Sequence, residues 1–184
     1  MPVIGIVGLP GSGKSEAAAV AREMDIPVVT MGDVVRAETE DRGLDPATDH
    51  GAVAQAMREE NGPAAIADRS LPIIESRLAE AGTVLVDGIR AGAEVEVFEE
   101  AFGEDLTVVE IYAPFDLREG RLSDRGRDTA AEDGGESLAE RDERELGFGM
   151  DAAIDAADVR IENTGSLEAF RDRVRTLLEE ESDP

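Results

Sequence analysis

The sequence is poor in the residues that build redox, metal and base-stacking sites. Its 184 residues include no cysteine, no tryptophan, one tyrosine and one histidine. Disulfides and thiolate metal sites are therefore excluded, and a single histidine, His50, does not favour a zinc site. Aromatic residues make up 3% of the chain, which argues against a stacking platform for single-stranded nucleic acid. We expect His50 to be a surface residue of a helical insert.

Long apolar runs are also missing. No run approaches the roughly 20 residues of a membrane-spanning helix. The first residues, "MPVIGIVG", enter a strand-like run without the basic segment and apolar core of a signal peptide. These features predict a cytoplasmic protein that makes no membrane contact.

Basic residues are scarce, and lysine most of all. The chain has 18 basic and 43 acidic residues, a formal net charge of −25, and Lys14 is its one lysine. Such a charge repels nucleic acid and anionic membranes. Lysine depletion with abundant acid indicates a salt-adapted protein, because molar salt shortens the Debye length to roughly 3 Å and screens self-repulsion. An acidic protein of an ordinary cell is the alternative, but it leaves the missing lysine unexplained.

Strand-like and helical segments alternate along the chain. Short apolar runs predict strands at 3–8, 26–30, 83–88, 106–114 and 157–165. Helices are expected at 13–24, 116–128 and 166–181, and over most of 31–80 with breaks at "GLDP" and "NGP". A polar, glycine-containing loop is expected at 129–137. The alternation predicts an α/β protein with a parallel sheet covered on both faces.

One motif in this pattern carries specific chemistry. The stretch "GLPGSGKS" fits G-x-x-x-x-G-K-[ST], follows a predicted strand and opens a predicted helix. Its glycines let backbone N–H groups form an anion nest, and the helix N-terminus adds positive potential. A plain glycine-rich turn is the alternative. The predicted nucleotide-binding residues here are Gly8, Leu9, Pro10, Gly11, Ser12, Gly13, Lys14, Ser15 and Glu16.

The roles within this motif follow from the chemistry of phosphoryl transfer. Lys14 should reach the β- and γ-phosphates of ATP, and Ser15 should bind Mg²⁺. The retention of Lys14 in a chain without other lysines indicates that arginine cannot replace it, because a planar guanidinium is larger than an ammonium. Asp87, which ends the predicted strand at 83–88, is a second Mg²⁺ ligand candidate, or else a turn residue.

Several further segments resemble nucleoside monophosphate kinases. "DGIR" (87–90) resembles the "DGFPR" segment of adenylate kinases, and "MGDVVRAE" (31–38) resembles their "TGDMLRA". "VVEIYAPFDLREGRLSDR" (108–125) resembles their segment before the lid, whereas "ADVRIENTGSLEAF" (157–170) is more similar to the end of dephospho-CoA kinases. With "RDERELGFG" (141–149), the whole most resembles an uncharacterised archaeal family of adenylate-kinase-like or dephospho-CoA-kinase-like proteins.

The resemblance implies a three-layer α/β/α P-loop kinase fold. It would have a five-stranded parallel sheet, a helical acceptor-binding insert and a small lid. The single domain 1–184 would comprise a core (1–30, 81–115 and 150–184), the insert (31–80) and the lid region (116–149). The activity implied is transfer of the γ-phosphate of Mg-ATP to a small acceptor, either a nucleoside monophosphate or dephospho-CoA. A P-loop ATPase or a nucleotide-dependent regulator is the alternative.

The resemblance also assigns residues by motif position. Arg36 and Arg90 would bind an acceptor phosphate, Arg121 would lie against adenine, and Arg125 would contact ATP phosphates. Asn163 and Gly165 would border the adenine, with a plain turn capped by Ser166 as the alternative. Solvent-exposed charge pairs are the alternative for Arg36 and Arg90 and for the lid arginines, where "ERDERE" alternates in charge as exposed helices do. The lid candidates are Arg127, Arg141 and Arg144.

Asp33 bears on the class of acceptor. A hydroxyl acceptor benefits from a carboxylate base, whereas a phosphate acceptor needs only charge neutralisation. Asp33 could act as that base, or it could cap the following helix. The partners expected are a small-molecule acceptor but no nucleic acid and no membrane, with the chain a monomer or homodimer.

Overall fold

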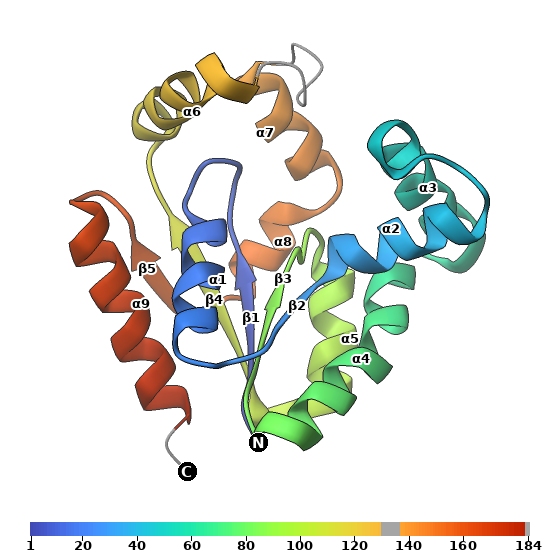
Figure 1. Cartoon of the computed structure of the whole chain (residues 1–184), viewed down its shortest axis with the longest axis horizontal. Coiled ribbons are helices and arrows are strands. Elements are labelled where there is room, and N and C mark those ends of the chain that lie inside the picture. The colour runs from blue at the N-terminus through green and yellow to red at the C-terminus, as the bar shows by residue number, and fades with distance from the viewer. Residues whose placement is uncertain (130–136, 183–184) are drawn as a thin grey trace.

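Five parallel strands form one sheet at the centre of the computed structural model, which describes residues 1–129 and 137–182 (Figure 1). The strand order is β2-β3-β1-β4-β5, and each neighbouring pair is parallel. The strands are β1 (Val3–Val7), β2 (Val28–Thr30), β3 (Val84–Asp87), β4 (Leu106–Tyr112) and β5 (Val159–Glu162). Each lies within its predicted range, so the predicted five-stranded parallel sheet is confirmed.

Helices connect the strands and cover both faces of the sheet (Figure 1). They are α1 (Lys14–Glu23), α2 (Met31–Asp41), α3 (Pro46–Asn61), α4 (Ala65–Ala81), α5 (Gly92–Phe102), α6 (Phe115–Thr129), α7 (Leu138–Gly147), α8 (Met150–Asp155) and α9 (Leu167–Ser182). A 3-10 turn at Gly103–Asp105 leads into β4.

The sheet separates two apolar cores. Ile4 and Ile6 of β1 pack with α1 and α9 on one face, and Val3 and Val7 of the same strand pack with α4, α5 and α8 on the other. Successive side chains of a strand point to opposite faces, so a strand covered on both sides must be apolar throughout. This burial explains the uninterrupted run "VIGIV" and fixes the three-layer arrangement.

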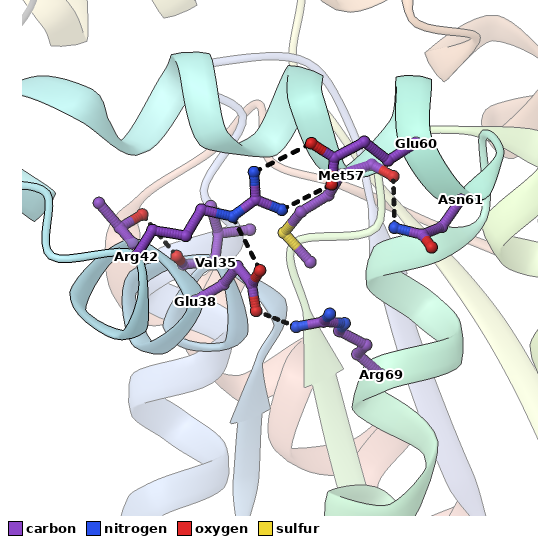
Figure 2. Close-up of polar contacts among 8 residues, drawn as sticks. Val35, Glu38, Arg42, Met57, Glu60, Asn61 and Arg69 are labelled. Atoms are coloured by element: carbon purple, nitrogen blue, oxygen red, sulfur yellow. Dashed lines mark hydrogen bonds and ion pairs between the residues drawn. The ribbon is translucent and has the colours of Figure 1, made fainter.

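The insert between β2 and β3 folds into three helices that break where the sequence predicts. Asp45 begins α3 by accepting a hydrogen bond from the N–H of Ala47 (2.9 Å). An ion-pair network then joins the three helices (Figure 2). Arg42, which follows the last residue of α2, contacts Glu38 of α2 (2.8 Å) and Glu60 of α3 (2.8 Å), and Arg69 of α4 also contacts Glu38. Exposed pairs of this kind add little stability, so the network mainly fixes how the helices lie together.

Helices α5, α7 and α8 were not predicted as elements. The start of α7 does carry a local signal, because the side chain of Ser137 accepts a hydrogen bond from the N–H of Glu140, and the carboxylate of Glu140 accepts one from the N–H of Ser137. This is the capping box S-x-x-E. The loop predicted at 129–137 falls mostly on 130–136, which lie outside the described residues. In the part of the chain that is described, no helix is both long and apolar enough to cross a membrane.

Candidate functional site

The turn between β1 and α1 wraps its backbone around Lys14. Gly8, Gly11 and Gly13 have φ angles of 146°, 76° and 119°, a region that favours glycine. Space is also tight there. A Cβ on Gly8 would lie 2.4 Å from the carbonyl oxygen of Ile111, and one on Gly13 would lie 2.5 Å from Nδ2 of Asn163. These glycines are therefore required both by backbone conformation and by packing, Gly8 against β4 and Gly13 against the residue that follows β5.

Lys14 is bound by its own loop. Its Nζ donates hydrogen bonds to the carbonyl oxygens of Gly8 (2.5 Å) and Leu9 (3.2 Å). Burial lowers the pKa of Lys14 from 10.5 to about 8, with Asp87 and Glu145 opposing this shift and Arg90 reinforcing it. Desolvation destabilises an ammonium that has no anion beside it, so a bound phosphate would raise the pKa of Lys14 again.

Asp87 and Ser15 are the residues that could supply oxygen ligands for a metal ion beside the cradle. Asp87 ends β3, whose neighbour β1 leads into the P-loop, and Ser15 lies exposed in the first turn of α1. Burial raises the pKa of Asp87, and the positive charge of Lys14 opposes that rise. No group of three or more acidic or histidine ligands exists among the described residues. One carboxylate and one hydroxyl suit Mg²⁺, which takes most of its remaining ligands from phosphates and water.

Arg118 is central to the site but was missed by sequence analysis. It is 4% exposed and lies in the first turn of α6. Its guanidinium donates to the carbonyl oxygens of Ala113 (3.0 Å) and Pro10 (3.1 Å), and to both oxygens of Asp142 on α7 (2.8 and 2.7 Å). Arg118 thus ties the P-loop to the end of β4 and to α7.

Arg121 and Asn163 form a second support for the P-loop. The buried side chain of Asn163 donates from Nδ2 to the carbonyl oxygen of Ser12 (2.7 Å). Nη2 of Arg121 donates to both the backbone carbonyl (2.7 Å) and Oδ1 (3.2 Å) of Asn163. Gly165 lies exposed two residues further on, and Ser166 caps α9 through the N–H of Ala169 (3.2 Å). Two of the three residues predicted at the adenine, Arg121 and Asn163, therefore contact each other, and Asn163 also contacts the P-loop.

Arg90 follows β3 and faces α7. Its Nη1 donates to Oε1 of Glu145, a buried carboxylate of α7. Its backbone N–H donates to the fully buried Glu94 (2.7 Å), whose other oxygen lies 3.6 Å from Arg58 of α3. Burial raises the pKa of Glu94. Arg58 also stacks on Phe148, with its guanidinium carbon 5.4 Å from the ring centroid.

Asp33 and Arg36 lie together on α2. Asp33 is the third residue of the helix, and Thr30 holds the N-cap position, so the alternative role of Asp33 as an N-cap is wrong. Arg36 donates to Asp33, and the two side chains are 54% and 68% exposed. His50 of α3 places its Nε2 3.3 Å from the carbonyl oxygen of Gly32 in the same turn of α2.

The remaining predicted residues contact α9, lie on α7, or have side chains outside the described part of the chain. Glu16, a predicted nucleotide contact, accepts a hydrogen bond from Arg171 of α9. The lid candidates Arg141 and Arg144 lie on α7, where Arg144 is 4.0 Å from Glu145. The side chains of Arg125 and Arg127 lie outside the described part of the chain.

The residues that sequence analysis missed had a weak local signal. Leu138, Asp142 and Glu145 of α7 are spaced i, i+4 and i+7, so they share one helix face. Leu138 and Glu145 are buried, and Asp142 is partly buried. Carboxylates at the inward positions of an amphipathic helix indicate buried cations opposite them. The sequence of α7 does not predict which basic residues lie opposite these carboxylates.

Comparison with known families matches most of the chain. Residues 7–139 match the family model described as an AAA domain. The chain is 61% identical to a UPF0200 protein of Halobacterium salinarum, over 97% of this chain and 93% of the relative. It is 49% identical to a UPF0200 protein of Methanothrix thermoacetophila, over 98% of each chain.

Solved structures share the fold at low identity. The protein TT1252 from Thermus thermophilus superposes with a TM-score of 0.63 at 24% identity, covering 97% of each chain. Shikimate kinase from Acinetobacter baumannii, solved with shikimate, superposes with a TM-score of 0.56 at 18% identity, covering 97% of this chain and 92% of that one. The sheet and its helices are thus those of a P-loop kinase fold, which is a nucleotide-binding fold.

Proposed function

We propose that this chain, which belongs to the UPF0200 family of archaeal proteins and carries an AAA domain, is an ATP-dependent phosphotransferase. Its acceptor is a small nucleotide-like molecule that bears phosphate. The 31–80 insert binds this acceptor, and the 116–149 region forms the lid. The observation that carries the proposal is the surroundings of Lys14: an ammonium in a glycine cradle, with Asp87 and Arg90 within its electrostatic reach.

The reaction transfers the γ-phosphoryl group of ATP. An acceptor oxygen forms a bond to the γ-phosphorus as the bond to the β–γ bridging oxygen breaks, and ADP leaves with that oxygen. Lys14 neutralises charge on the β- and γ-phosphates, and Arg90 neutralises the acceptor. Ser15 and Asp87 would hold Mg²⁺, which would supply further charge neutralisation when bound.

Two acceptor classes fit the residues on α2. A nucleoside monophosphate offers a phosphate oxygen that needs no base, and Arg36 and Arg90 supply the positive charge for it. Dephospho-CoA offers a hydroxyl whose proton must leave, and the exposed carboxylate of Asp33 is within reach of solvent and could accept it. Both acceptors bear phosphate, and we expect Arg36 and Arg90 to bind it, because a guanidinium donates paired hydrogen bonds to phosphate oxygens.

The test is an ADP-release assay with separate acceptors. Purified protein in molar KCl is given Mg-ATP alone, or with AMP, CMP, UMP, GMP, dTMP, dephospho-CoA or shikimate. We expect ADP release to rise strongly with one phosphate-bearing acceptor, and the phosphorylated product to appear in equal amount. Equal ADP release with and without every acceptor would refute the kinase proposal and favour an ATPase. Stimulation by shikimate alone would refute the phosphate-bearing acceptor.

A substitution tests which side of the site Arg90 serves. We expect Arg90→Ala to raise the KM for the acceptor at least about tenfold and to leave the KM for ATP within about twofold, because charged hydrogen bonds contribute about 1.5–3 kcal/mol. The matched control is Arg77→Ala, which removes an exposed arginine of α4 that pairs with Glu80. A larger change in the KM for ATP would mean that Arg90 serves the donor.

A further inference from the structure

Helix α7 carries two carboxylates that point toward different parts of the site. Asp142 and Glu145 are three residues apart, so they lie on one face of the helix. Asp142 accepts two hydrogen bonds from Arg118, which also donates to Pro10 in the P-loop. Glu145 accepts from Arg90, beyond the end of β3. One helix face thus joins the proposed donor loop to the proposed acceptor arginine.

The two ion pairs differ in how easily a soluble anion can reach them. The side chains of Arg118 and Asp142 are 4% and 13% exposed, and the guanidinium of Arg118 is shared among a carboxylate and two backbone carbonyls. Arg90 is 45% exposed, although its partner Glu145 is only 6% exposed. Its contact with Glu145 uses Nη1, on one side of the guanidinium. The Arg118 pair is therefore fixed, whereas the Arg90 pair is open to exchange with an anion from solvent.

The burial of Glu145 gives it a second effect. A carboxylate with so little solvent access depends on neighbouring cations for its charge to be stable. Arg90 is such a cation, and Glu145 is also close enough to Lys14 to contribute to its electrostatic environment. A phosphate arriving at Arg90 would bring at least as much negative charge as this carboxylate, and its oxygens can accept the same paired hydrogen bonds from a guanidinium. The two anions would compete for one guanidinium.

We propose that Glu145 is an internal competitor for the acceptor phosphate. Without acceptor, its carboxylate occupies Arg90. A bound acceptor phosphate displaces it, while the Arg118–Asp142 pair keeps α7 attached to the P-loop. The inference rests on the proposed function in that it takes Arg90 to be the acceptor's arginine. Its consequence is specificity, because Arg90 becomes available beside Lys14 only when an acceptor anion has replaced Glu145, which disfavours transfer to water.

The test is a binding measurement that requires no phosphoryl transfer. The P-loop is first saturated with Mg-ADP, and AMP is then titrated by calorimetry into the full chain in molar KCl. We expect Glu145→Gln to bind AMP about fivefold more tightly than the unmodified chain. A change of this size matches the free-energy contribution of a partly exposed ion pair. In an Arg90→Ala background, the same substitution should give no gain.

The matched control is Glu143→Gln, which removes the same charge from the exposed side of α7. It should leave AMP affinity unchanged. A second variant, Glu145→Asp, keeps the charge but shortens the side chain by one methylene, and it should also tighten AMP binding. Thermal melts of each variant verify that α7 still folds, and Glu145→Asp carries the test if Glu145→Gln does not fold.

Any of three results with AMP would overturn the inference: unchanged or weaker binding in both Glu145 variants, a gain that persists without Arg90, or an equal gain in Glu143→Gln. If AMP fails to bind the unmodified chain, inorganic phosphate is the second probe, and failure of both probes in every variant also overturns it. A Glu145-dependent gain in a protein that transfers phosphate to no acceptor would refute the proposed function but not this inference.

Discussion

The charge state of Lys14 should control nucleotide affinity near neutral pH. Its pKa of about 8 in the free protein means that the ammonium is mostly present at pH 7 and mostly absent at pH 9. If only the ammonium binds phosphate, the association constant for Mg-ATP should fall about tenfold between these two pH values. A lysine with its ordinary pKa of 10.5 would give almost no change over this range.

The same shift affects folding stability, with a defined sign. Because the folded-state pKa is below the unfolded value, the unfolded chain binds more protons between pH 8 and 10.5. The free energy of unfolding contributed by Lys14 therefore rises with pH across that window. Below pH 8 the buried charge costs its full amount, at most about 3 kcal/mol from the size of the shift. Salt should alter this little, because the main cause is desolvation rather than a distant charge.

The composition makes a direct measurement possible. Lys14 is the one lysine of the chain, so protein grown with lysine labelled at the ε-carbon gives one side-chain resonance to follow through the pH titration. Calorimetry of a non-hydrolysable Mg-ATP analogue at pH 7, 8 and 9 supplies the affinities, and buffers of different ionisation heat count the protons taken up. Lys14→Met is the control, and its binding should be weaker and independent of pH.

Two results would refute this reasoning. One is a resonance that titrates near 10.5 in the free protein, which would mean that the cradle does not desolvate the ammonium. The other is an affinity that falls equally with pH in Lys14→Met, which would place the titrating group elsewhere.

Three further substitutions have defined outcomes. Lys14→Arg should lower kcat by at least about a hundredfold in the acceptor assay, because a guanidinium does not fit the cradle, and near-normal turnover would contradict this account of the retained lysine. Asp142→Ala leaves Arg118 buried without its carboxylate and should lower the free energy of unfolding by about 3 kcal/mol in urea titrations, whereas a loss under about 1 kcal/mol would mean that solvent reaches the pair. Gly13→Ala places a Cβ 2.5 Å from the side-chain amide nitrogen of Asn163 and should abolish Mg-ADP binding in calorimetry. If the variant binds Mg-ADP with wild-type affinity, this prediction is wrong.

Local patterns were enough to predict the sheet and the phosphate cradle. The apolar run of β1 must be buried on both faces, and its glycine-rich turn must lead into a helix, so the stretch from Gly8 to Ser15 was recognisable without any distant contact. The breaks in the insert were also local, because Pro46 cannot continue a preceding helix and the side chain of Asp45 begins the next.

Helices α5, α7 and α8 were harder to predict because their faces are set by what they pack against. In α7, "AERDEREL" offers acids and arginines at nearly every position, and charge alternation alone indicates a solvent-exposed helix. The burial of Glu145 depends on Arg90, which is 55 residues away in the sequence. The side chain of Asn163 donates to Ser12, 151 residues away, and no local pattern indicates this contact.

The sequence by itself determined the fold class, the glycine cradle and the single lysine within it, because each depends on neighbouring residues, backbone conformation or overall composition. The tertiary structure decided which charges surround that lysine. Arg118 contacts Pro10 across 108 residues, and Glu145 pairs with Arg90, the arginine that motif position assigns to the acceptor. Contacts over such separations form only when the folded chain brings distant elements together, and that placement is a property of the packed elements rather than of any one segment.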